Sequence, residues 1–107
     1  MTGPFYHVVF FWLKEPENPE TRSFFLEVLN TFLDNTPGIM TRHIGSPAAT
    51  NREVIDSSYT FSLILTFESK ETQDAYQEHP AHKVFVEKCA ELWDRVQVYD
   101  SVVLGGN

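Results

Sequence analysis

The sequence contains a single cysteine, few basic residues and no long hydrophobic run. Cys89 alone cannot form an intramolecular disulfide or a thiolate metal cluster, and this usage is typical of a reducing compartment. Eight Lys and Arg against fifteen Asp and Glu give a formal net charge of -7, which argues against nucleic-acid and anionic-membrane partners. No apolar run approaches the roughly 18 residues of a membrane span, and the start lacks the charged segment of a signal peptide. We therefore expect a cytoplasmic protein.

The hydrophobic content, in contrast, is that of one folded domain. The chain has 107 residues, of which 42% are hydrophobic, and it includes nine Phe, four Tyr and two Trp. This length is sufficient for a core of its own, so we expect a single domain over residues 1–107. Cys89 lies within a helical apolar pattern, and we interpret it as a small core residue rather than a catalytic thiol.

Hydrophobic periodicity predicts four strands and two main helices. The strands have the alternation or the β-branched and aromatic content of sheets, over Phe5–Lys14, Ile39–Gly45, Tyr59–Phe67 and Arg95–Leu104. One helix follows Pro19, another runs from Pro80 to about Trp93, and Glu68–Tyr76 forms a capped helical turn or two. A polar loop covers Ser46–Ser58. This β-α-β-β-α-β order predicts an α+β, ferredoxin-like sandwich, in which a four-stranded antiparallel sheet carries its helices on one face.

The first strand is apolar on both of its faces. Its odd-numbered positions are apolar apart from His7, as expected for a strand beneath helices. Its even-numbered positions should face water in a monomer, yet they carry Tyr6, Val8, Phe10 and Trp12. The three rings would expose roughly 450–750 Å², which matches or exceeds the largest patch on a typical monomer. We therefore predict a homodimer in which two sheets pack face to face through these four residues.

Two histidines flank a proline in the stretch YQEHPAHKVF. Pro80 is favoured as the first residue of a helix, which makes His79 its N-cap and His82 its third residue. No adjacent acidic or thiol side chain completes a four-coordinate metal site, and no Gly-rich phosphate loop occurs elsewhere. We therefore predict neither a metal nor a cofactor.

An acid–base role has better physical support than a metal site. The positive end of the helix dipole disfavours a protonated His82, and a neutral imidazole is what a general base requires. Tyr76 precedes the helix start, and His7 lies on the helix-facing side of the first strand. The three side chains would share a pocket if the second helix crosses that strand. The alternative is that they are helix-start and core residues, and the residue pattern alone leaves both interpretations open.

Three segments resemble the stress-responsive A/B barrel (Dabb) family: HVVFFWLK, YTFSLILTFESKETQDAYQEHPAHKVFVE and VYD. The resemblance covers nearly the whole chain in the same order, and TFES followed by YxxHPAH is its most specific part. It implies a ferredoxin-like subunit that pairs into a dimeric α/β barrel. Many members have no established activity, and plant members resemble stress-induced proteins. One enzyme member, the olivetolic acid cyclase, closes a linear polyketide by an aldol-type reaction without cofactor or metal.

The resemblance also implies site residues. The catalytic histidine of the cyclase falls on His82, its nearby tyrosine on Tyr76 and its first-strand histidine on His7. A further histidine, in the third strand of the cyclase, is replaced here by Phe61, which puts the same cyclase chemistry in doubt. The apolar positions of the ligand pocket fall on Phe25, Val28, Phe61, Leu63, Val96 and Val98.

Three functions stay open at this point. The first is a homodimer that binds a small apolar or carbonyl-containing ligand between sheet and helices, with cofactor-free acid–base chemistry of the aldol or cyclase kind. The second is a non-enzymatic stress or interaction module with a filled core. The third is a cofactor-independent monooxygenase, because related dimeric barrels carry out such reactions. The sequence does not decide whether the protein is an enzyme, and it identifies no ligand.

Overall fold

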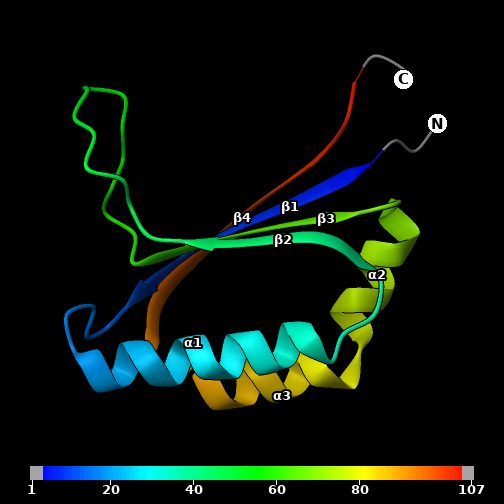
Figure 1. Ribbon diagram of the computed structural model, residues 1–107, viewed down its shortest axis with the longest axis horizontal. Helices are drawn as coiled ribbons and strands as arrows, with labels where there is room; N and C mark the ends of the chain where they lie inside the picture. The colour runs from blue at the N-terminus through cyan, green and yellow to red at the C-terminus, as the bar shows by residue number, and fades with distance from the viewer. Residues whose placement is uncertain (1–3, 105–107) are drawn as a thin grey trace.

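The computed structural model describes residues 4–104, which form four strands and three helices (Figure 1). In chain order the elements are β1 (Phe5–Leu13), α1 (Pro19–Asp34), β2 (Ile39–Gly45), β3 (Phe61–Phe67), α2 (Lys70–Glu78), α3 (Pro80–Cys89) and β4 (Trp93–Val102). None of the helices in this part of the chain is long and apolar enough to cross a membrane.

The four strands form one antiparallel sheet in the order β2-β3-β1-β4. The helices lie on one side of this sheet, with α1 and α3 side by side beneath it and α2 close to the end of β3 (Figure 1). This arrangement confirms the predicted ferredoxin-like α+β sandwich. It contains one helix more than the predicted order, because the short helical turn before Pro80 is a complete helix, α2, with its own direction.

The alternation of β1, which lies at the centre of the sheet, sets the core. The odd-numbered residues of β1 are buried beneath the helices, and the even-numbered ones point to the outer face. Phe11 packs edge to face on Phe25 of α1, with 5.0 Å between the ring centroids. Cys89 is fully buried in the same core, and burial raises the pKa of its thiol to about 11. Cys89 is therefore a weak nucleophile at neutral pH, as its sequence context predicted.

The strand β3 starts two residues later than its alternation predicts, at Phe61. Thr60 turns the chain, and its N–H donates to the carbonyl of Phe11 at 2.7 Å. Tyr59 consequently packs against Phe10 on the outer face, with ring centroids 4.8 Å apart, instead of sharing the inner face with Phe61. A hydrogen bond across the sheet thus overrides the period-two pattern at this end of the strand.

The last strand starts earlier than predicted, at Trp93 rather than Arg95. The N–H of Lys14 donates to the carbonyl of Leu92 at 2.9 Å, which joins the end of β1 to the start of β4. The Trp93 ring lies 5.6 Å from that of Phe11. Trp93, which was predicted as the end of the second helix, therefore belongs to the sheet.

The outer face of the sheet carries the four residues predicted for a dimer interface. Tyr6 is 41% exposed, and Val8, Phe10 and Trp12 are partly buried. The loop between β2 and β3 rises on this side, away from the helices (Figure 1). From this loop Ser58 accepts a hydrogen bond of 2.9 Å from Nε1 of Trp12. The outer face is therefore apolar, and it is less open than β1 alone suggests.

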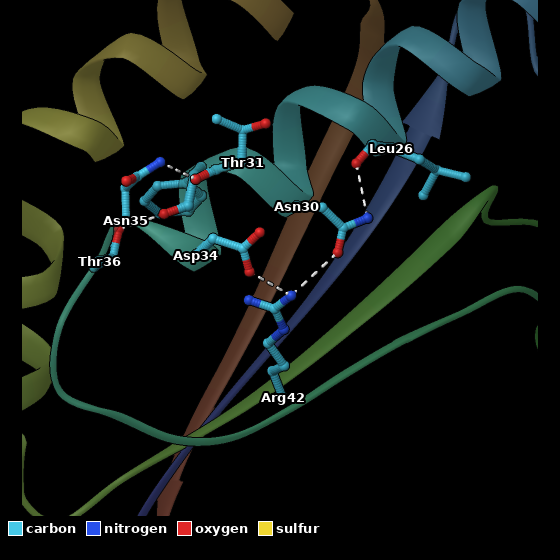
Figure 2. A network of polar contacts seen from close by, with 8 residues as sticks. Leu26, Asn30, Thr31, Asp34, Asn35, Thr36 and Arg42 are labelled. Carbon is cyan, nitrogen blue, oxygen red and sulfur yellow. Dashed lines mark hydrogen bonds and ion pairs between the residues drawn. The ribbon is translucent and has the colours of Figure 1, made fainter.

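Polar contacts tie the C-terminal end of α1 to the edge strand β2 (Figure 2). Arg42 of β2 forms an ion pair of 2.8 Å with Asp34, and its guanidinium lies 3.4 Å from Oδ1 of Asn30. Just beyond the helix, the hydroxyl of Thr36 donates to the carbonyl of Phe32 at 2.6 Å. These contacts position the end of α1 that carries the ring of Phe32.

Gly38, in the turn between α1 and β2, provides a test of this packing. Its φ is 93°, and a Cβ there would lie 2.7 Å from Cγ2 of Thr72. We expect Gly38→Ala to lower the free energy of unfolding by about 1–3 kcal/mol, measured by urea denaturation. In a Thr72→Ser background, which lacks the clashing methyl group, the loss should be smaller but not zero. An unchanged stability of Gly38→Ala would contradict this account of the turn.

Candidate active site

A cavity of about 490 Å³ lies between the inner face of β1, the edge strand β4 and the helices α2 and α3. Aliphatic and aromatic side chains form most of its lining. Six polar residues from these four elements also line it: His7, Gln73, Tyr76, Gln77, His82 and Asp100. The polar side chains thus meet in one space, although they are far apart in the sequence.

The break between α2 and α3 brings Tyr76 and His82 to the same cavity. His79 ends α2 and caps α3, and its Nδ1 accepts the N–H of Ala81 at 3.0 Å. Pro80 follows as the first residue of α3, where no backbone N–H is required. The predicted capping role of His79 is confirmed. Because the chain turns at this point, the last turn of α2 and the first turn of α3 contribute to one wall.

The rings of His7, Tyr76 and His82 form a continuous row. The Tyr76 centroid lies 5.5 Å from that of His7 and 5.5 Å from that of His82. Phe32 of α1 supports the row, since its ring lies 5.5 Å from Tyr76 and 5.6 Å from His82. The structure therefore brings together the three residues that the sequence analysis selected for acid–base chemistry.

Asp100 of β4 holds the imidazole of His7. The two residues face each other in the register of β1 and β4, and Nδ1 of His7 lies 2.6 Å from Oδ1 of Asp100. A carboxylate can only accept, so Nδ1–H is the donor, and Nε2 of a neutral His7 is left as an acceptor. The His7 side chain is 5% exposed and that of Asp100 is 43% exposed. The pair thus fixes the orientation of a buried ring from the edge of the sheet.

Burial shifts two protonation equilibria in the directions that acid–base chemistry needs. Burial, and then the negative charge of Asp100, raises the pKa of Tyr76, so its phenol stays protonated. Burial, and then the nearby His7, lowers the pKa of His82, so its imidazole is neutral at pH 7. The neutral state agrees with the expectation from sequence, and burial is its main cause in the structure.

Three of the six predicted pocket residues line this cavity, namely Leu63, Val96 and Val98. The other three lie elsewhere. Phe25 and Phe61 stack on each other in the core, with centroids 5.4 Å apart, and are 0% and 4% exposed. Val28 faces a separate groove between α1 and α3. The reason is that the cavity lies towards the edge strand β4. Phe25 and Val28 belong to α1, and Phe61 packs against α1 through Phe25.

Three polar residues of the cavity were not predicted from the sequence: Asp100, Gln73 and Gln77. Asp100 depends on the register of β1 with β4, which no local pattern reveals. Gln73 lies three residues before Tyr76, and this helical spacing was a usable signal because residues i and i+3 share a face. Within residues 4–104, no group of three or more His, Cys, Asp or Glu side chains is arranged to hold a metal ion.

Comparison with known proteins gives a family match and several similar folds. A model of the stress-responsive A/B barrel domain matches residues 5–103. A Dabb family protein from Mesorhizobium loti is 24% identical, with a TM-score of 0.80, over 96% of this chain and 99% of that chain. A hydroxynitrile lyase from Passiflora edulis is 13% identical, with a TM-score of 0.81, over 97% of this chain and 96% of that chain.

A third similar structure, from Thermobifida fusca, is described as a dimeric ferredoxin-like protein of unknown function. It is 14% identical, with a TM-score of 0.76, over 96% of this chain and 93% of that chain. At these identities the structural matches show the shared fold. None of the curated proteins matches the chain.

The lowered pKa of His82 gives a pH prediction. In an NMR titration of Hε1, His82 should titrate below the ordinary value of 6.5. Between the folded and unfolded pKa values the unfolded chain binds more protons, so the free energy of unfolding should fall as the pH falls through this window. This part of the pH dependence should be missing in His82→Gln. A His82 midpoint at or above 6.5 would be incompatible with the burial seen here.

Proposed function

The chain belongs to the stress-responsive A/B barrel domain family, and we propose that its cavity binds a small carbonyl compound and moves a proton beside the carbonyl group. One observation carries the proposal. A phenol, an imidazole and a second imidazole held by a carboxylate line a single, mostly apolar cavity. Such a combination of donor, acceptor and orienting groups in an apolar pocket is characteristic of acid–base sites.

The lining favours a neutral ligand with an apolar body. Val9, Phe85, Trp93 and Val96 are among the side chains that would contact it. None of the described residues that line the cavity is Lys or Arg, so a carboxylate or phosphate group would have no cation to bind. The volume of about 490 Å³ is in the range of small-molecule sites. A ketone or aldehyde with a short hydrocarbon chain fits these requirements.

In the proposed reaction His82 takes a proton from the carbon next to the carbonyl group. The electron pair of the broken C–H bond forms the C=C bond of an enolate, and the negative charge moves to the carbonyl oxygen. The O–H of Tyr76 donates a hydrogen bond to that oxygen, while His7, held by Asp100, orients this arrangement. The enolate carbon then attacks a second carbonyl, whose π electrons move to its oxygen, and that oxygen takes the proton from His82. Without a second carbonyl, His82 returns the proton to the carbon. The step consumes no oxidant or reductant.

The alternative functions have less support. A module with a filled core would have no space of about 490 Å³ beside these residues. A monooxygenase would form its product only in the presence of oxygen. None of the described residues that line the cavity is characteristic of oxygen activation. The replacement that argued against cyclase chemistry carries little weight, because Phe61 packs on Phe25 outside the cavity.

We also propose that two copies pair through the outer faces of their sheets. Tyr6 and Tyr99 are 41% and 60% exposed on this face. Phe10 contacts Tyr99 on the same face, with ring centroids 6.2 Å apart. Burying such a patch is favourable, and a similar solved structure is described as dimeric. The helices and the cavity would remain on the far side of each sheet.

Hydrogen exchange of heptan-2-one in D₂O tests the proton transfer without assuming an end product. The protein should accelerate the exchange of hydrogen for deuterium at the carbons next to the carbonyl. ¹H NMR measures this exchange as the loss of the signals of those hydrogens. His82→Gln should lower the accelerated rate by about 10²–10⁴-fold, because the base is lost. Tyr76→Phe should lower it by about 10²–10³-fold, because the enolate oxygen loses its donor.

His79→Asn is the matched control for this experiment. His79 lies at the same helix break, it is not among the residues lining the cavity, and Asn preserves the helix cap. Its exchange rate should equal that of the unmodified protein. Acceleration that survives in His82→Gln would show that another group is the base, and no acceleration by the unmodified protein would exclude the proposed reaction.

The dimer predicts a mass of two chains in sedimentation equilibrium at micromolar concentration. Val8→Asp should reduce the measured mass to that of one chain, because each copy would bury an unpaired carboxylate in the dimer interface. Val84→Asp makes the same change at a 46% exposed site on α3, and it should leave the mass unchanged. A mass of one chain for the unmodified protein would overturn the proposed pairing.

A further inference from the structure

The amide of Gln73 is a buried polar group that the proton transfer does not use. Gln73 is 6% exposed, lies in the first half of α2 and lines the cavity. None of the hydrogen bonds found among residues 4–104 involves its side chain. The same part of the chain has no fully buried side-chain N or O atom without a partner. The polar atoms of the amide therefore keep some accessible surface, and the cavity is the space that Gln73 lines.

An amide in this position is poised for a ligand. Removing an amide from bulk water without a hydrogen-bond partner costs free energy, so an apolar side chain would be the cheaper lining if packing alone mattered. Gln77 makes a useful contrast, because it is exposed at the edge of the cavity and keeps its contact with solvent. Gln73, deeper in the lining, offers two N–H donors and one carbonyl acceptor to whatever enters.

The position of Gln73 relative to Tyr76 limits which ligand atom it can reach. The two residues are three apart on α2, so their side chains lie next to each other on one face of the helix. Both line the cavity. Two neighbouring donors on one wall match two oxygen atoms that are close together in one ligand.

We propose that Gln73 is a specificity-determining residue for 1,3-dioxygenated ligands, such as β-diketones, with its N–H donating to the second oxygen while Tyr76 binds the first. This inference rests on the proposed function and adds the substrate class to it. Removal of the proton between two carbonyl groups gives an enolate whose charge is shared by both oxygens. The amide and the phenol would then stabilise the same anion from adjacent positions. No charged second group is expected, because the cavity lining, as far as the structure describes it, has no Lys or Arg.

Calorimetric titration of two matched probes tests the assignment. Heptane-2,4-dione carries both oxygens, and heptan-2-one has the same chain length with one oxygen. Gln73→Met keeps the side-chain length and removes the donors. It should weaken binding of the dione by about five- to tenfold and leave binding of the ketone unchanged. Gln73→Glu retains an acceptor of nearly the same shape without the N–H donors, and it should weaken dione binding at least as much.

The outcomes separate this inference from the proposed function. If the unmodified protein binds both probes and Gln73→Met changes their affinities equally, or changes neither, the role of Gln73 is wrong while the carbonyl site stands. If Gln73→Glu binds the dione as tightly as the unmodified protein, the donated hydrogen bond is wrong. If the unmodified protein binds neither probe, the proposed ligand class fails and the inference fails with it. Melting curves from circular dichroism establish that each variant is folded.

Discussion

The pairing of β1 with both β3 and β4 is the constraint on which the cavity and its polar groups are built. Because β1 has a neighbour on each side, its alternation places His7 on the inner face between Leu65 and Asp100. A shift of one residue in the β1–β4 register would turn Asp100 to the outer face and leave the buried imidazole without its carboxylate. Register, rather than any local motif, therefore sets the orientation of His7.

The helix break at His79 is the second determinant of the site. A continuous helix from α2 into α3 would carry Tyr76 and His82 in different directions, since they are six residues apart. The break instead lets both side chains contact Phe32, whose ring also stacks on Phe85 at 5.1 Å. This aromatic cluster packs behind the polar row, and the cavity that holds the row opens on the side of the edge strand β4.

Much of the fold could be predicted from the sequence, because it depends on strong local signals. The two-faced β1, the cap and proline at His79–Pro80 and the strand Ile39–Gly45 all appear in the structure as expected. The starts of β3 and β4 could not be predicted, because hydrogen bonds between distant segments decide them at Thr60 and Leu92, whereas the end of β3 at Phe67 was predicted correctly.

The site shows the same division between local and long-range information. The proximity of Tyr76 and His82 follows from a few residues of sequence, and the parity of β1 indicated that His7 faces inward. Asp100 and the position of the cavity depend on strand register and on which end of the sheet the helices leave open. Phe25 on α1 and Phe61 on β3 illustrate this. Both are apolar and point between sheet and helices, and such a pattern in the sequence is equally compatible with a core residue and a pocket residue. Packing places them in the core.

The most direct measurement is chemical-shift mapping of a heptan-2-one complex by ¹H–¹⁵N NMR, with the imidazole nitrogens included. If the ligand occupies the cavity against the polar row, the largest changes should fall on the imidazoles of His7 and His82 and on the backbone around Tyr76. Changes concentrated instead at Phe24 and Val84, which line the groove between α1 and α3, would contradict the proposed site. Unchanged chemical shifts of His7, Tyr76 and His82 at a saturating concentration of the ketone would contradict it as well.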